Sequence, residues 1–209
     1  MSTTIGFIAI EGNQLSSLAE IFSRFQLIDT NKDLHLNSWA EASKIIEQEY
    51  LEPNDFSQRR VVWFQNNWTI IEDHSLLLCT DTEALQKNAL EGRLCIYSFL
   101  SQSTSNSHGF WHFTPTVSRT FFIEDGETIE NTGTPLPQEA NLNINEDLYY
   151  DDIIELAATL GIDYYAAEQL KQFTVKQLIN NAELNSQIEQ IKNEQKSIQV
   201  AKKPWWKFW

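Results

Sequence analysis

The apolar and polar positions of the first fifty residues predict one strand followed by two helices. Residues 5–10 form an unbroken apolar run that stops at Glu11, which is typical of a buried strand. Apolar side chains then recur at helical spacing over residues 14–25, which indicates an amphipathic helix. A second helix is expected after Ser38, because Ser38 can cap it and Glu41 occupies the reciprocal position of a capping box.

The middle of the chain changes to the two-residue period of β-strands. Apolar runs at 60–64 and 68–71 flank Gln65-Asn66-Asn67, which predicts a hairpin because asparagine tolerates the backbone conformation of a tight turn. A strand at 76–79 is predicted next, followed by a helix that Thr80 or Thr82 caps and that ends at Gly92. A strand at 94–100 and a polar loop at 101–107 come after it. The last part is a meander of strands at 110–113, 117–123 and 128–129, with a turn at Asp125-Gly126.

The last third of the chain is predicted to be mainly helical. Helices are expected over 145–160, where Gly161 ends the helix, and over 163–173. Apolar residues at heptad-like spacing predict a C-terminal helix over 174–199 that protrudes or packs on the surface, and residues 200–209 form a Lys/Trp-rich tail.

These patterns predict an α+β fold, with a mainly antiparallel sheet and flanking helices, followed by C-terminal helices and an aromatic tail. The hairpins stand between helical segments without the regular alternation of a parallel βαβ sheet. Residues 1–173 are therefore expected to form a single domain.

The composition narrows the class of function. The 209-residue chain holds 15 basic and 29 acidic residues, and its net charge of −14 argues against a nucleic acid partner because phosphate binding needs a basic surface. The presence of only two cysteines excludes a disulfide-rich secreted scaffold. No apolar run is long enough to span a bilayer and no basic signal-peptide region is visible, so we expect a cytoplasmic protein without a transmembrane segment.

The acidic residues are unevenly distributed. Between Thr120 and Leu170 the chain has no Lys or Arg, and acids occur throughout this stretch. Such a stretch is either a solvated surface that aids solubility or a docking surface for a basic partner. The docking hypothesis places the partner-binding residues around the start of the predicted helix: Asp147, Asp151, Asp152 and Glu155.

The chain carries no recognisable catalytic or metal-binding motif. His108 and His112 lack the HExxH arrangement of a zinc helix, and Cys79 and Cys95 are too far apart for a CxxC knuckle. Both cysteines lie in apolar runs, which is typical of buried structural thiols. We therefore expect no enzyme activity, no cofactor and no metal. The alternative is an enzyme whose site lies near the 101–112 loop and includes one of these histidines.

The last eight residues are the most unusual segment. Their aromatic side chains can fold back onto the domain, fill the pocket of a partner protein, or contact a membrane interface. A docking peptide is the preferred hypothesis, and it assigns partner binding to Trp205, Trp206, Lys207, Phe208 and Trp209.

Four segments occur in an order that resembles a known group of proteins. They are Asn67 to Asp73, Arg119 to Glu127, Gly133 to Glu139 and Asp151 to Asp163. Over residues 5–165 the chain resembles a loosely defined group of bacterial cytoplasmic proteins of unknown function, some of which are similar to immunity proteins that neutralise toxins of contact-dependent or type VI secretion systems. The shared motifs are structural, so the resemblance assigns no catalytic residue.

Beside the enzyme alternative near the 101–112 loop, the sequence leads to two hypotheses of protein binding. The first is a non-catalytic, immunity-like protein whose acidic surface neutralises a basic toxin, as the resemblance and the base-free stretch imply. The second is an adaptor that docks a partner through its C-terminal peptide. Both make a protein the partner, and neither predicts an oligomeric state.

Overall fold

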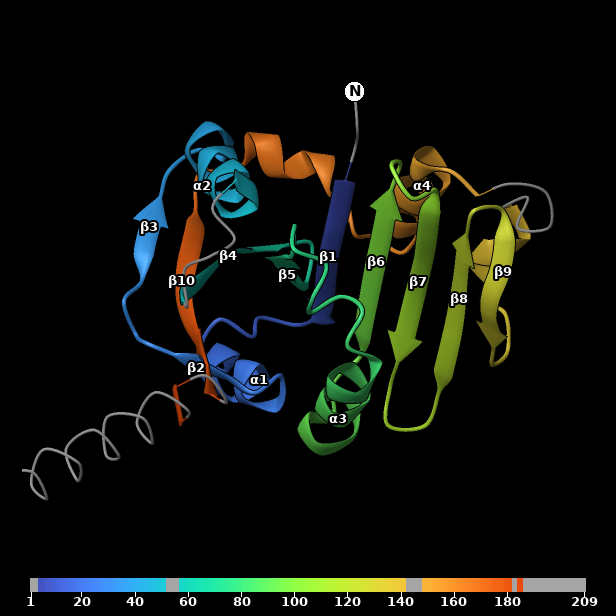
Figure 1. Cartoon of the computed structure of the whole chain (residues 1–209), viewed down its shortest axis with the longest axis horizontal. Helices are drawn as coiled ribbons and strands as arrows, with labels where there is room; N and C mark the ends of the chain where they lie inside the picture. The colour runs from blue at the N-terminus through green and yellow to red at the C-terminus, as the bar shows by residue number, and fades with distance from the viewer. Residues whose placement is uncertain (1–3, 52–56, 142–147, 182–183, 186–209) are drawn as a thin grey trace, which may run out of the picture.

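The computed structural model describes residues 4–51, 57–141, 148–181 and 184–185 (Figure 1). Its strands are β1 (Thr4–Glu11), β2 (Leu27–Asp29), β3 (Leu34–Leu36), β4 (Ser57–Gln65), β5 (Trp68–Glu72), β6 (Ile96–Gln102), β7 (Ser107–Phe113), β8 (Ser118–Glu124), β9 (Glu127–Thr132) and β10 (Phe173–Asn180). Its helices are α1 (Leu18–Arg24), α2 (Trp39–Leu51), α3 (Thr82–Gly92) and α4 (Tyr150–Thr159), with short 3-10 helices η1 (Pro137–Asn141) and η2 (Tyr165–Gln169).

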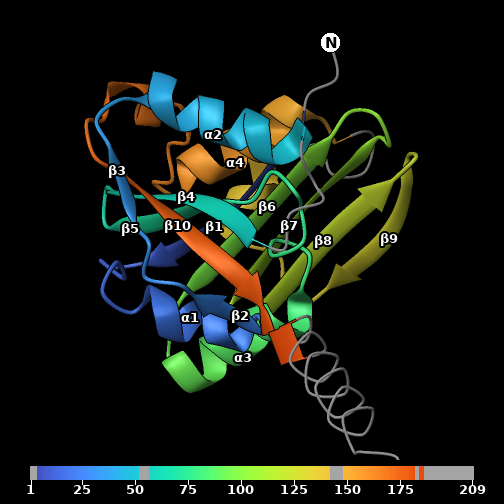
Figure 2. The same ribbon diagram turned by 60° about the vertical axis from the view of Figure 1, so that its left-hand side comes forward.

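The strands form one ten-stranded sheet in the order β2-β10-β4-β5-β1-β6-β7-β8-β9, and β3 also pairs with β10. All of these pairings are antiparallel, which confirms the predicted α+β class. Helices α2 and α4 lie on one side of the molecule, and α1 and α3 on the other (Figure 1 and Figure 2). No helix within the described ranges has the length and apolar character needed to cross a bilayer.

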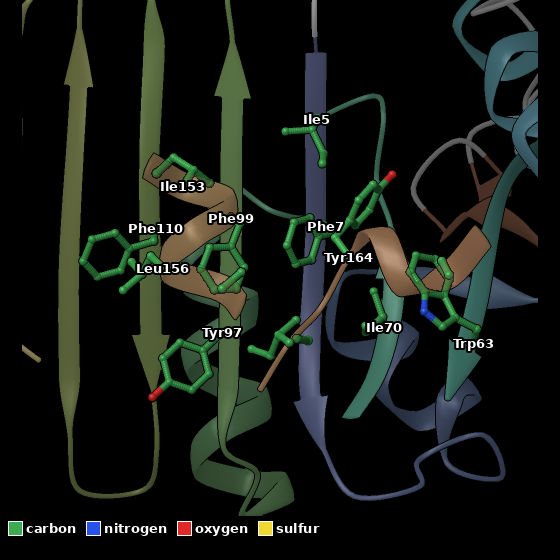
Figure 3. Close-up of a cluster of buried hydrophobic side chains, with 14 of the residues drawn as sticks. Ile5, Phe7, Trp63, Ile70, Tyr97, Phe99, Phe110, Ile153, Leu156 and Tyr164 are labelled. Atoms are coloured by element: carbon green, nitrogen blue, oxygen red, sulfur yellow. The ribbon is translucent and has the colours of Figure 1, made fainter. Parts of the chain in front are cut away.

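One face of the sheet, which we call the α4 face, packs against α2, α4 and η2. Figure 3 shows Phe99 and Phe110 of the sheet close to Leu156 of α4. Phe7 of the central strand β1 stacks on Phe99, with ring centroids 4.8 Å apart, and also contacts the ring of Tyr164 at 5.0 Å. This aromatic layer anchors α4 and the segment leading into η2 to the sheet.

The opposite face, which we call the α1 face, packs against α1 and α3. Ile8 and Ile10 of β1 lie in the same buried cluster as Ile21 and Phe22 of α1 and Leu85 of α3. Because β1 has a helical layer on both sides, its apolar run is continuous rather than alternating. The predicted buried first strand is therefore confirmed.

Both predicted tight turns are confirmed. Asn66 and Asn67 adopt positive φ angles of 48° and 68° between β4 and β5. Asp125 and Gly126 adopt 50° and 78° between β8 and β9, which is the left-handed conformation that a type I′ turn requires.

The prediction of a helix beginning at residue 174 is wrong, because residues 173–180 form strand β10. This strand lies inside the sheet, between β4 on one side and β2 and β3 on the other. Phe173 and Val175 are buried on the α4 face and Leu178 on the α1 face, so apolar positions do not alternate along the whole strand. Lys176 is accommodated by ion pairs with Asp29 (3.0 Å) and Asp33 (2.7 Å). The domain therefore extends to at least residue 180. Most of the predicted C-terminal helix and all of the tail lie outside the described residues.

The predicted strand at 76–79 is also wrong. The segment folds into turns around Asp73, and Leu76 has a φ of 63°. The turns press against the backbone of Gly6, where an added Cβ would come within 2.6 Å of the Asp73 carbonyl oxygen. Glycine is therefore required at this position.

Two smaller corrections concern loops. The polar segment predicted as a loop at 101–107 is shorter, because β6 and β7 extend to Gln102 and Ser107. The predicted helix over 163–173 is only the 3-10 helix η2, followed by an extended approach to β10.

Candidate functional site

Helix α4 presents part of the predicted acidic surface. The Asp152 carboxylate accepts a hydrogen bond from the backbone N–H of Tyr149 (2.8 Å), which stabilises the first turn of the helix. Leu156 is buried against the sheet, whereas Asp151 and Glu155 are exposed. Asp151 and Glu155 are four residues apart, so both carboxylates lie on the solvent side of the helix.

The β8–β9 turn contributes a second group of acids. Glu124, Asp125 and Glu127 are all exposed there. The backbone N–H of Asp125 donates to the carbonyl of Asn106 (3.2 Å), and the Ser107 hydroxyl donates to Glu124 Oε1 (3.4 Å). These contacts hold the β8–β9 turn against the neighbouring β6–β7 turn.

His108 lies near both acidic groups, that of the β8–β9 turn and that of α4. Its ring nitrogens contact the Ser101 hydroxyl (2.8 Å) and Asn106 Oδ1 (3.2 Å), and the side chain is only 3% exposed. Burial lowers the pKa of His108, and the charge of Asp152 opposes that shift. Figure 1 draws α4 at the end of the sheet that carries both turns, and the helix packs against β6 and β7. We call the resulting surface the acidic end, which comprises Glu124, Asp125, Glu127, Asp151, Asp152 and Glu155.

Only some of the predicted partner-binding residues lie in the described part of the chain. Asp151, Asp152 and Glu155 belong to the acidic end. Asp147 lies outside the described residues, as do the tail residues Trp205, Trp206, Lys207, Phe208 and Trp209. The acids of the β8–β9 turn were not singled out from the sequence, although they lie in the same base-free stretch.

Not every acid of that stretch reaches the surface. The Glu139 carboxylate is buried in a two-pronged ion pair with Arg119, with contacts of 2.9 Å and 2.6 Å. A buried carboxylate neutralised in this way cannot attract a partner. The charge pattern alone could not separate Glu139 from the exposed acids, because Arg119 immediately precedes the stretch.

A second buried histidine, His112, lies near a cysteine. Its Nε2 lies 3.7 Å from the Sγ of Cys95, and its ring stacks on Tyr97 with centroids 4.2 Å apart. Burial raises the pKa of Cys95 to about 11, with a further contribution from Glu11, and burial lowers the pKa of His112. Both groups are therefore neutral near pH 7, whereas cysteine catalysis uses a thiolate.

The other cysteine, Cys79, is likewise a buried thiol with a raised pKa. Cys79 is fully buried, and burial raises its pKa well above the usual value. It lies in the turns after β5 rather than in the predicted strand. Among the described residues, no group of three or more His, Cys, Asp or Glu side chains is arranged to hold a metal ion.

Glu72 is a buried acid that sequence reasoning missed. It is 3% exposed, accepts a hydrogen bond from the Tyr164 hydroxyl (2.8 Å), and its pKa is raised to about 8 by burial. Its place at the end of an apolar run was the available signal, because that position continues the buried face of β5.

No family model, curated protein or solved structure matches this chain. Its function is therefore inferred from the acidic end and from the chemistry of the residues around it.

Proposed function

We propose that this chain is a non-catalytic protein-binding protein whose acidic end binds a basic protein partner. The observation that supports this proposal is that two acidic groups, from the β8–β9 turn and from α4, lie at the same end of the sheet (Figure 1). By register Glu124 and Glu127 lie towards the α1 face and α4 lies on the opposite face, so the acids flank that end from both sides. Both groups come from the stretch between Thr120 and Leu170, which contains no Lys or Arg.

The electrostatic consequence is a field of one sign over that end of the molecule. Such a field attracts a basic protein over a distance of about one Debye length, roughly 8–10 Å at physiological salt. Its main effect is on the rate of association and on the choice of partner. Binding through the acidic end should therefore weaken as salt concentration rises.

The rigidity of the surface suits it to a preformed interface. The acids of the hairpin are held by a type I′ turn, and those of α4 lie on a helix packed against β6 and β7. Little conformational freedom of the backbone is then lost on binding. Within this proposal, the resemblance to immunity proteins points to a basic toxin, whose active-site cleft the acidic end would cover.

The test compares two variants that change the net charge equally. The variant D151K/E155K reverses two charges of the acidic end, and E47K/E83K reverses two exposed acids on α2 and α3. Each full-length protein is used to capture partners from a lysate of the native cell. The association and dissociation rates of any basic protein captured by the wild type are then measured over a range of salt concentrations.

We expect D151K/E155K to bind at least about tenfold more weakly, mainly through slower association, while E47K/E83K binds as the wild type does at high salt. Melting temperatures of both variants would show that they fold. Equal affinities for the two variants, or binding by the wild type that does not respond to salt, would contradict the proposal.

A further inference from the structure

A pocket of about 360 Å³ opens on the α1 face, close to the edge of the sheet that carries β3. The pairing of β3, β4 and β10 shows to which face of the sheet its side chains point. Val62 pairs with Thr174, and Thr174 pairs with His35, so these three side chains point to the same face. Phe64 follows Val62 by two residues on β4 and shares that face. Val62 belongs to the buried cluster of α1, so the pocket lies on the α1 face where the sheet extends beyond that helix.

The floor of the pocket is apolar and includes an accessible aromatic ring. Val62 is fully buried beneath it, whereas Phe64 is 37% exposed. Leu15, from the loop before α1, forms part of the wall and is also 37% exposed. A ligand that presents an apolar face would remove both exposed side chains from water.

The rim of the pocket is polar but carries no fixed charge. None of the residues that line it is Asp, Glu, Lys or Arg, although the chain holds 29 acids and 15 bases. His35 is the one histidine among the lining residues, and its Nδ1 contacts the Thr174 hydroxyl (3.4 Å). A charged ligand would find no opposite charge here, so the chemistry of the rim selects a neutral one.

Side-chain amides supply the hydrogen-bonding groups of the rim. Asn13, Asn37 and Gln172 come from three separate segments and converge on the pocket. Asn13 Oδ1 accepts from the backbone N–H of Leu15 (3.2 Å), which leaves its NH₂ group available. Within the described part of the chain, the side-chain amides of Asn37 and Gln172 have no protein hydrogen-bond partner. Each amide can both donate and accept, which matches a hydroxyl group that also does both.

We infer that this pocket binds a neutral carbohydrate. A sugar ring has an apolar C–H face, which would lie against Phe64, and hydroxyl groups around its edge, which would bind the amides of the rim. The volume falls in the range of about 300–1,000 Å³ that is usual for small-molecule sites. A purely apolar ligand would leave the amides unsatisfied, and a sugar acid or amino sugar would bring an unpaired charge. This site lies on β3, β4 and β10, so it is separate from the acidic end.

The test is a titration of the full-length, ¹⁵N-labelled protein at neutral pH with glucose, galactose, mannose and N-acetylglucosamine. Glucuronic acid and glucosamine serve as charged counterparts. We expect at least one neutral sugar to shift the backbone resonances of residues 35–37, 62–64 and 172–174, and the charged counterparts to bind more weakly. The variant F64A should reduce the affinity about tenfold, because it removes the aromatic surface.

The matched control is I129A, which removes an exposed apolar side chain from β9, far from the pocket in the strand order. It should bind the sugar as the wild type does. The inference is wrong if no neutral sugar in the panel shifts the pocket resonances at high millimolar concentration. It is equally wrong if F64A and I129A bind with the same affinity, or if charged and neutral sugars bind alike.

Discussion

Two neighbouring carboxylates, Glu72 and Asp73, are buried on opposite faces of the sheet and have different partners there. Glu72 ends strand β5 and points to the α4 face, where it is 3% exposed. Asp73 follows it and points to the α1 face, where it is fully buried. Because successive side chains of a strand alternate between faces, two adjacent acids enter two separate environments.

Asp73 is surrounded by groups that stabilise its charge. Oδ1 lies 2.9 Å from the Arg60 guanidinium and accepts from the Ser75 hydroxyl (2.8 Å). Oδ2 accepts from the backbone N–H groups of Leu78 (2.6 Å) and Cys79 (2.9 Å). The carboxylate therefore organises the turns that replace the predicted strand at 76–79.

Among the described residues, the hydrogen-bond partner of Glu72 is the hydroxyl of Tyr164 (2.8 Å), whose ring lies among the aromatic side chains of the α4 face (Figure 3). One hydrogen bond does not compensate for the loss of hydration, and the pKa of Glu72 rises to about 8. The comparison shows that two neighbouring buried acids can have very different numbers of hydrogen-bond and ion-pair partners.

The largest effect is expected for D73A. This variant leaves the Arg60 guanidinium buried without its carboxylate and the N–H groups of Leu78 and Cys79 without an acceptor. Breaking a buried ion pair by removing one partner costs about 3–5 kcal/mol of unfolding free energy. Urea denaturation measures the loss. The exposed D151A serves as a control and should change stability by no more than about 0.5 kcal/mol. Equal losses for the two variants would show that Asp73 does not organise its surroundings.

The next effect is a pH dependence that E72Q should remove. The pKa of Glu72 is about 8 in the folded protein and about 4.5 in an exposed chain, so between these values the folded state holds a proton that the unfolded state has released. The stabilisation from this group is therefore fully present below pH 4.5. It falls by up to about 1.4 kcal/mol per pH unit between pH 4.5 and about 8, and it levels off above that.

The measurement is the difference in unfolding free energy between the wild type and E72Q at several pH values from 4 to 9. The difference isolates Glu72, because other groups titrate in both proteins. Burial lowers the pKa of His108 and His112, so those groups destabilise the protein as pH falls, which is the opposite direction. A difference that does not vary with pH would mean that Glu72 is ionised in the folded protein.

The smallest effect is expected for Y164F, which keeps the ring and removes the hydroxyl. The loss of its hydrogen bond to Glu72 should cost about 1 kcal/mol and should raise the pKa of Glu72 further, because that bond favours the charged carboxylate. The matched control is Y165F, whose hydroxyl contacts Tyr150 at the surface (2.6 Å). If Y165F costs as much as Y164F, the hydroxyl of Tyr164 has no special relation to Glu72.

The parts of the fold that were predicted correctly depend on local chemistry. The Asn66-Asn67 and Asp125-Gly126 turns need residues that tolerate positive φ, and α4 needs an amphipathic pattern with acids at its start. The acids of α4 were found in the same way, because Asp151 and Asp152 stand in a stretch without bases. Information of this kind lies within a few neighbouring residues.

The incorrect predictions involve contacts between distant residues. The segment of strand β10 was predicted as part of the C-terminal helix, and it is a strand because β4 and β2 pair with its backbone on both sides. The turns at 76–79 depend on Asp73 and on the close approach that Gly6 permits. The pocket on the α1 face combines the loop before α1 with β3, β4 and β10, which no local pattern connects.

The sequence by itself determined the α+β class, the hairpin turns, the acidic stretch and its missing bases, since each follows from residue type and short-range spacing. Only the tertiary structure decided which acids are exposed, as the contrast between Glu139 and Glu155 shows. It also decided the different environments of Glu72 and Asp73. The physical reason is that burial and pairing depend on which distant segments meet, and the free energy of a polar group depends on those neighbours more than on its own identity.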